Sequence, residues 1–166
     1  PTTVLEQTVA RIRALDESTT GENAQDVADA IRDIVQDHAG VFRTTELLEK
    51  GVKEILAIEP RVRNIHLKDK SKVFNTARIE ALEVENIYEV AKATLISAAA
   101  RKECRGAHTV VDFELPPDHA DYPYGRRDDE WMKHTLWFSS DNRLEYKPVR
   151  YRPLSVQAIP PKPRTF

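Results

Sequence analysis

The chain has 166 residues, of which 40% are hydrophobic and 31% are charged, and this length suits a single domain. Its 25 basic and 27 acidic residues give a formal net charge of -2, so the composition provides no overall field for binding nucleic acid. No apolar run reaches the roughly 18 residues that span a bilayer, and we expect no direct membrane insertion. The single cysteine excludes an internal disulfide and a multi-cysteine metal site.

The beginning of the chain indicates a piece of a longer protein. It starts at Pro1, and its only methionine is Met132. Ordinary removal of an initiator methionine and a remnant of a purification tag are the alternatives.

The composition changes sharply near residue 106. Eight of the ten prolines and nine of the twelve aromatic residues lie between Ala107 and Phe166. We therefore divide the chain into a helical bundle over 1–106 and an extended tail with a β-hairpin over 107–166.

Apolar residues at helical spacing predict helices over Val4–Ile12, Val27–His38 and Leu48–Leu56. A mobile loop is expected from Asp16 to Glu22, where the sequence is polar. Between the second and third helices, Gly40 is expected to end one and Thr44 or Thr45 to begin the other, which makes a helical hairpin.

The longest predicted helix runs from a capping residue, Asn75, to Cys104, and Gly106 is expected to end it. Before it, Pro60 should break or kink the preceding helix. The segment 61–72 carries five basic residues and one acidic residue, but it lacks an aromatic residue to stack on a base, so we interpret it as a solvated loop. The predicted apolar stripe of the long helix consists of Ile79, Leu82, Asn86, Ile87, Val90, Ala91, Thr94, Leu95 and Ala98.

The tail contains a predicted β-hairpin, with strands over Thr135–Phe138 and Leu144–Tyr151. The closing segment Ile159–Phe166 has three prolines and should lie extended against another surface. The predicted fold is mainly α: a three-helix bundle followed by a proline- and aromatic-rich tail with a small β-hairpin.

Several residues have side chains that could carry chemistry, but the spacing favours structural roles. Cys104 and His108 could share a metal or act as nucleophile and base, yet Gly106 interrupts the helix between them, and no third group is placed to assist. The carboxylates of 128–130 fit the start of a helix. The sequence has no phosphate-binding glycine loop or dinucleotide fingerprint, so we expect it to bind no cofactor by itself.

The segment from Arg101 to His108, Arg-Lys-Glu-Cys-Arg-Gly-Ala-His, crowds charges at the end of the long helix. This segment resembles the C-terminal domain of succinate dehydrogenase and fumarate reductase flavoprotein subunits. Four other segments share the resemblance: 74–76 (Phe-Asn-Thr), 127–131 (Arg-Asp-Asp-Glu-Trp), 133–136 (Lys-His-Thr-Leu) and the ending 160–166. The resemblance is closest to succinate dehydrogenase. L-aspartate oxidase shares the arginine-glycine-histidine motif and remains an alternative.

The resemblance implies an intact subunit that oxidises succinate to fumarate at a bound FAD and passes electrons through an iron-sulfur subunit to quinone. It implies a complex on the cytoplasmic face of the bacterial inner membrane or on the mitochondrial matrix side. This segment would be structural and would pack on the flavin and capping domains, with no catalytic, cofactor or metal residue of its own. The predicted domain-interface residues are Arg101, Glu103, Arg105, His108, Arg127, Trp131 and His134. A free-standing helical module that binds a protein partner is the competing class.

Overall fold

The computed structural model describes residues 2–120 and 124–162. It is mainly helical with a small two-stranded antiparallel sheet, as the sequence predicted. In chain order the helices are α1 (Thr2–Glu17), α2 (Ala24–Ala39), α3 (Thr45–Ala57), α4 (Glu59–Val62), α5 (Thr76–Ala100), the 3₁₀ turn η1 (Val111–Phe113) and α6 (Asp128–Trp131). The strands are β1 (Lys133–Phe138) and β2 (Arg143–Pro148).

Helices α2 and α3 form the helical hairpin that the apolar spacing predicted. Asn23 caps α2, since its Oδ1 accepts a hydrogen bond from the backbone N of Gln25 at 2.8 Å. Thr44 caps α3, since its Oγ1 accepts from the backbone N of Leu47 at 3.1 Å. Gly40 follows α2 with an extended backbone (φ -62°), so it does not supply the left-handed conformation of a capping glycine.

The expected loop after the first helix is corrected, whereas the helix break predicted at Pro60 is confirmed. α1 continues to Glu17, so the expected loop from Asp16 to Glu22 begins later than predicted. α3 ends at Ala57, and Pro60 lies in the first turn of the short helix α4. Proline is tolerated there because the first-turn N–H groups have no helical partner.

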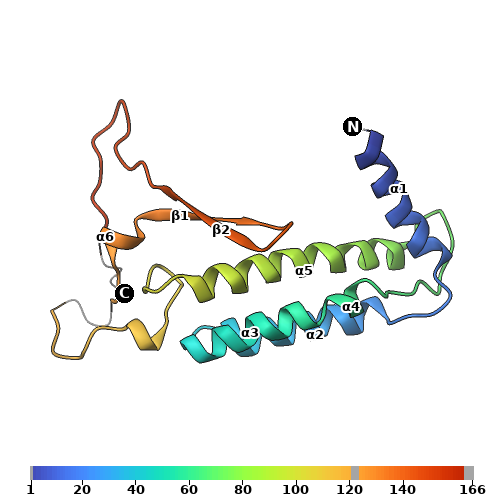
Figure 1. Cartoon of the computed structure of the whole chain (residues 1–166), viewed down its shortest axis with the longest axis horizontal. Helices are drawn as coiled ribbons and strands as arrows, with labels where there is room; N and C mark the ends of the chain where they lie inside the picture. Colours follow the sequence, from blue (N-terminus) through green and yellow to red (C-terminus); the bar gives the residue numbers. More distant parts are fainter. Residues whose placement is uncertain (1, 121–123, 163–166) are drawn as a thin grey trace.

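Helices α2, α3 and α5 pack against one another and enclose the core, with α5 lying along the other two (Figure 1). α3 approaches its neighbours closely at Gly51. A Cβ atom there would lie 2.5 Å from the Cβ of His38 and 2.9 Å from a methyl of Leu95. α1 stands at the end where α5 begins and points away from it (Figure 1). The side chains that are at most 2% exposed include Ile31, Leu48, Ile55, Val84, Tyr88 and Leu95.

The buried face of α5 differs from the predicted stripe. Ile79 and Val90 were placed in it, but they are 56% and 67% exposed. Tyr88 and Lys92 are also buried, since the ring and the aliphatic stem cover the core, and Nζ of Lys92 donates to Oε1 of Glu89 at 3.0 Å. Ala91, Leu95 and Ala98 of the predicted stripe are buried, so the prediction is confirmed at these positions and wrong at Ile79 and Val90.

α5 was predicted to reach Cys104, but it ends at Ala100. Arg101 has an extended backbone (φ -85°, ψ 107°), and its side chain bonds carbonyl groups of the hairpin segment. Gly106 is not the helix cap. It has φ +59° and lies in a tight turn, in which Arg105 and His108 exchange backbone hydrogen bonds of 2.8 and 3.0 Å.

The β-hairpin is present, with Thr135 opposite Tyr146 in its register. Its strands begin earlier than predicted, and β2 ends at Pro148, where proline has no N–H to continue a ladder. β1 packs on α5. Beyond the hairpin, 149–162 has no helix or strand. The predicted extended ending Ile159–Phe166 lies partly outside the described residues, which stop at 162.

Among the residues that the structure describes, no helix combines the length and apolar character needed to cross a membrane.

Candidate domain-interface site

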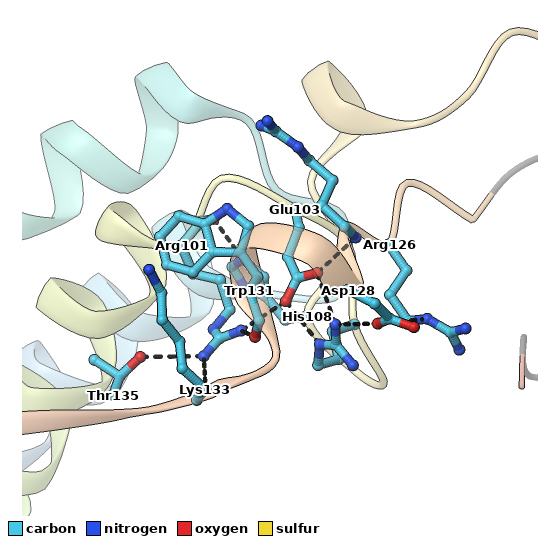
Figure 2. Close-up of polar contacts among 10 residues, drawn as sticks. Arg101, Glu103, His108, Arg126, Asp128, Trp131, Lys133 and Thr135 are labelled. Carbon is cyan, nitrogen blue, oxygen red and sulfur yellow. Dashed lines mark hydrogen bonds and ion pairs between the residues drawn. The ribbon is translucent and has the colours of Figure 1, made fainter. Parts of the chain in front are cut away.

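Glu103 is the centre of a charged cluster just after α5. Its side chain is fully buried. Oε1 accepts hydrogen bonds from Nη1 of Arg101 at 2.6 Å and Nε of Arg105 at 2.7 Å, and Oε2 accepts from Nη2 of Arg105 at 3.1 Å and the backbone N of Arg127 at 2.9 Å. A buried carboxylate is tolerated only when it is paired and hydrogen-bonded in this way. Glu103 therefore joins the end of α5 to the segment before α6 (Figure 2).

Arg101 ties the same cluster to the hairpin. Its guanidinium donates to the carbonyl oxygens of Trp131 at 3.1 Å and Lys133 at 2.7 Å, and to Oγ1 of Thr135 at 3.2 Å. It also lies 5.1 Å from the centre of the Trp131 ring, within the range of a cation–π contact. These contacts explain why the helix stops at Ala100, because a helical Arg101 would direct its side chain elsewhere.

Arg105 extends the cluster to α6. Its Nη2 donates to Oδ1 of Asp128 at 2.6 Å, and Nε of Arg126 lies 2.9 Å from the same oxygen. The hydrogen bond to Glu103 is the main cause that raises the pKa of Arg105. Asp128 therefore belongs to the cluster and is not the free catalytic carboxylate that its acidic neighbourhood could suggest.

His108 connects the cluster to the turn between α2 and α3. Nη1 of Arg43 donates to Nδ1 of His108 at 2.9 Å, while Nε2 lies 3.2 Å from the carbonyl oxygen of Arg101. A guanidinium has no acceptor, so the imidazole is neutral, with its proton on Nε2. Burial lowers the pKa of His108, and the neighbouring guanidinium charges of Arg43 and Arg101 add to this. Arg43 is itself held by the carbonyl oxygen of Gly40 at 2.9 Å.

Cys104 does not form a catalytic pair with His108. Its thiol donates to the carbonyl oxygen of Val110 at 3.3 Å, and both ring nitrogens of His108 bond other groups. Burial raises the pKa of Cys104, which opposes the thiolate that nucleophilic attack requires. Within the described ranges, no cluster of three or more His, Cys, Asp or Glu side chains is arranged to hold a metal ion.

An aromatic and cationic stack supports the hairpin. Trp131 is 5% exposed and meets the Tyr146 ring edge to face at 5.7 Å. Nζ of Lys133 lies over both rings, at 4.5 and 4.3 Å. On the other side, Nζ of buried Lys92 lies 4.8 Å from the Tyr88 ring and 5.4 Å from the Trp137 ring. Lys92 of α5 thus contacts Trp137 of β1, while Trp131, Lys133 and Tyr146 pack on one another at the other end of the hairpin.

The structure brings most of the predicted interface residues together. Arg101, Glu103, Arg105, His108 and Trp131 share one network, and Arg127 joins through its backbone N, while its exposed side chain pairs with Glu130. His134 lies at an exposed position of β1. Sequence reasoning missed Arg43 and Arg126. Arg43 lies 65 residues before His108, and no local spacing signals such a contact.

Three of the five glycines in this chain are packed too tightly to receive the pyrophosphate of a flavin dinucleotide. Pyrophosphate recognition uses glycines that let backbone N–H groups approach the phosphates. Here Gly125 is pressed against the carbonyl oxygen of Phe113, Gly21 against that of Asn64, and Gly51 against His38. These glycines serve close packing within the fold, and none of them is available to a phosphate.

Most of the chain matches a known protein family. Residues 28–166 match the family model described as fumarate reductase flavoprotein C-term. The chain belongs to this family, the C-terminal domains of succinate dehydrogenase and fumarate reductase flavoprotein subunits. The resemblance noted in the sequence is thereby confirmed, and the family's members are parts of oxidoreductase flavoproteins.

Named relatives and solved structures agree with the family. The chain is 34% identical over 160 residues to a succinate dehydrogenase flavoprotein subunit of Coxiella burnetii, covering 96% of this chain and 25% of that protein. It is 38% identical over 167 residues to the corresponding subunit of Rickettsia bellii, with coverages of 98% and 26%. A mutant E. coli quinol fumarate reductase FrdA matches with a TM-score of 0.75 at 27% identity, with coverages of 95% and 26%. The chain spans about a quarter of these relatives.

Proposed function

We propose that this chain is the C-terminal part of the flavoprotein subunit of a succinate dehydrogenase. The whole subunit would oxidise succinate to fumarate with FAD and pass electrons to an iron-sulfur subunit and then to quinone. The single observation that carries the proposal is the match to succinate dehydrogenase flavoprotein subunits along almost the entire chain. FAD and the dicarboxylate would be held by other parts of the subunit, because the sequence of this chain has no phosphate-binding glycine loop and no dinucleotide fingerprint.

The role proposed for this segment is structural. The helices of 1–106 would form the bundle, and 107–166 would form the tail that packs on the bundle and on the flavin and capping domains. The cluster around Glu103 supports this role because its charges are satisfied by one another. The cluster would hold the turn at Gly106, α6 and the hairpin in one fixed arrangement. The exposed side chains of Arg127 and His134 would be available to a neighbouring domain.

A fumarate reductase is the second candidate. A fumarate reductase flavoprotein subunit of Haemophilus influenzae is 34% identical over 146 residues, and the structural match to FrdA favours the same reading. Succinate oxidation and fumarate reduction are one reaction in opposite directions, so this domain serves either equally well. In both cases the subunit would sit in a membrane-associated complex, on the bacterial cytoplasmic face or the mitochondrial matrix side.

The test is made on the longer polypeptide that the proposal requires. We expect it to copurify with flavin, to oxidise succinate with an artificial electron acceptor, and to reduce fumarate with a reduced viologen dye. The ratio of the two rates distinguishes dehydrogenase from reductase. A polypeptide without flavin, or one with flavin that acts on L-aspartate but not on succinate or fumarate, would contradict the proposal.

A further inference from the structure

The turn just before α5 presents an unusually exposed aromatic side chain. Phe74 is 99% exposed, and its neighbour Val73 is 72% exposed. The backbone of Phe74 has φ +51°, in the left-handed region that bulky residues rarely adopt. Such a conformation persists only where the surroundings impose it, and it is often associated with binding or switching sites.

Polar contacts from its neighbours hold the turn in place. Asn75 is buried, and its Nδ2 donates to the carbonyl oxygens of Asp69 at 2.9 Å and Ser71 at 2.8 Å, while its Oδ1 accepts from the backbone N of Arg78 at 2.8 Å. The guanidinium of Arg78 also reaches the carboxylate of Asp16 in α1 at 2.7 Å. The turn is therefore firmly built, although the ring that it presents has almost no contact with the protein.

A shallow hollow adjoins the ring. Phe74 and Ile79 line it together, and Ile79 is 56% exposed. Lys72 and Arg78 also line it. Arg78 is paired with Asp16, so Lys72 supplies the positive charge beside the apolar centre, which suits a partner surface with an apolar pocket and an acidic group next to it.

We propose that Phe74 and Ile79 form a docking point that inserts into an apolar, acid-rimmed pocket on the rest of the same flavoprotein subunit. This inference rests on the proposed function. The small contact area of this docking point argues against a second copy of the chain as its partner. A stable dimer buries roughly 1,200–2,000 Å² in total, far more than one phenylalanine ring and one isoleucine provide. A pocket in the same polypeptide needs less contact area, since the connection raises the effective concentration. The relatives, about four times as long as this chain, have the additional sequence to supply such a pocket.

Phe74→Gly tests the proposal because it should change the melting temperature in opposite directions in this chain alone and in the longer polypeptide. In this chain alone, glycine removes the left-handed strain and loses no packing, so the melting temperature should rise by about 2 °C. In the longer polypeptide the docking contact is lost, and the melting temperature of this domain should fall by at least about 2 °C. Phe74→Asn, which also tolerates the left-handed region, should reproduce the loss in the longer polypeptide.

Asn142→Gly is the matched control, because Asn142 also has a positive φ (57°) but lies in the hairpin turn. It should change both melting temperatures in the same direction. A rise for Phe74→Gly in both settings, or a dimer of this chain that Phe74→Gly dissociates, would overturn the docking proposal. The proposed function is tested separately on the unmutated longer polypeptide, and it fails only if flavin and activity on succinate and fumarate are absent there.

Discussion

Replacing Glu103 by alanine should release the hairpin segment from the end of α5. The carboxylate is fully buried, and its partners Arg101 and Arg105 have side chains that are only 15% and 27% exposed. The substitution removes the one acceptor that two guanidinium groups and the backbone N of Arg127 share. Removing one partner of a buried charged network costs about 3–5 kcal/mol. With a urea m value of about 2 kcal/mol per M, the midpoint at which the hairpin region unfolds should fall by roughly 1.5–2.5 M.

The assay follows two signals during urea unfolding. Both tryptophans, Trp131 and Trp137, lie in the α6 and hairpin region, so their fluorescence reports this part of the chain, while far-ultraviolet circular dichroism reports the helices. For Glu103→Ala we expect the fluorescence to change at lower urea than the dichroism, because α2, α3 and the core of α5 do not depend on this cluster. Glu103→Gln, which keeps the size and one acceptor oxygen, should give a smaller shift.

Glu130→Ala is the matched control, since Glu130 forms an exposed ion pair with Arg127, and such pairs contribute at most about 1 kcal/mol. If Glu103→Ala shifts the fluorescence midpoint no more than this control does, the cluster is not what fixes the hairpin.

Three further predictions concern single residues. Burial lowers the pKa of His108, so as pH falls below about 6.5 its imidazole is protonated in the unfolded chain before it is protonated in the folded chain. The free energy of unfolding, measured in urea, should therefore decrease with falling pH and level off below the folded-state pKa, and His108→Gln should reduce this pH dependence. Gly51→Ala should destabilise the chain by about 1–3 kcal/mol in thermal unfolding, because its Cβ would lie 2.5 Å from that of His38, and an unchanged melting temperature would refute the close packing. The buried thiol of Cys104, bonded to Val110, should react with a disulfide reagent at pH 7 at least about 100-fold more slowly in the folded chain than in urea, whereas equal rates would show that it is accessible.

Local patterns were sufficient where local interactions decide the structure. The capping residue Asn75 predicted the start of α5, and Thr44 was one of the two caps expected for α3. Periodic apolar residues predicted α2 and α3, and two short segments on either side of a polar stretch predicted the hairpin. These features depend on hydrogen bonds and side-chain spacing within a few residues.

The predictions that were wrong or missing concern features that depend on contacts between segments far apart in the sequence. The end of α5 was misplaced because Arg101 bonds carbonyl groups some thirty residues later. The partner of His108 could not be foreseen, because Arg43 lies in the turn between α2 and α3. The charges of the 101–108 motif were recognised as unusual, yet only the folded arrangement shows that Glu103 is buried as the shared acceptor of the two arginines.

Hydrogen exchange on this chain alone and within the longer polypeptide tests most directly whether this segment packs on other domains of a flavoprotein subunit. The tail 149–162 has exposed apolar side chains, including Leu154, Val156 and Ile159, and it has no helix or strand of its own. We predict that its amide groups and those of 72–74 exchange at least about tenfold more slowly in the longer polypeptide, while the buried middle of α5 exchanges equally in both. Equal exchange of the tail in both would contradict the account, because the tail would then be covered by nothing beyond this chain.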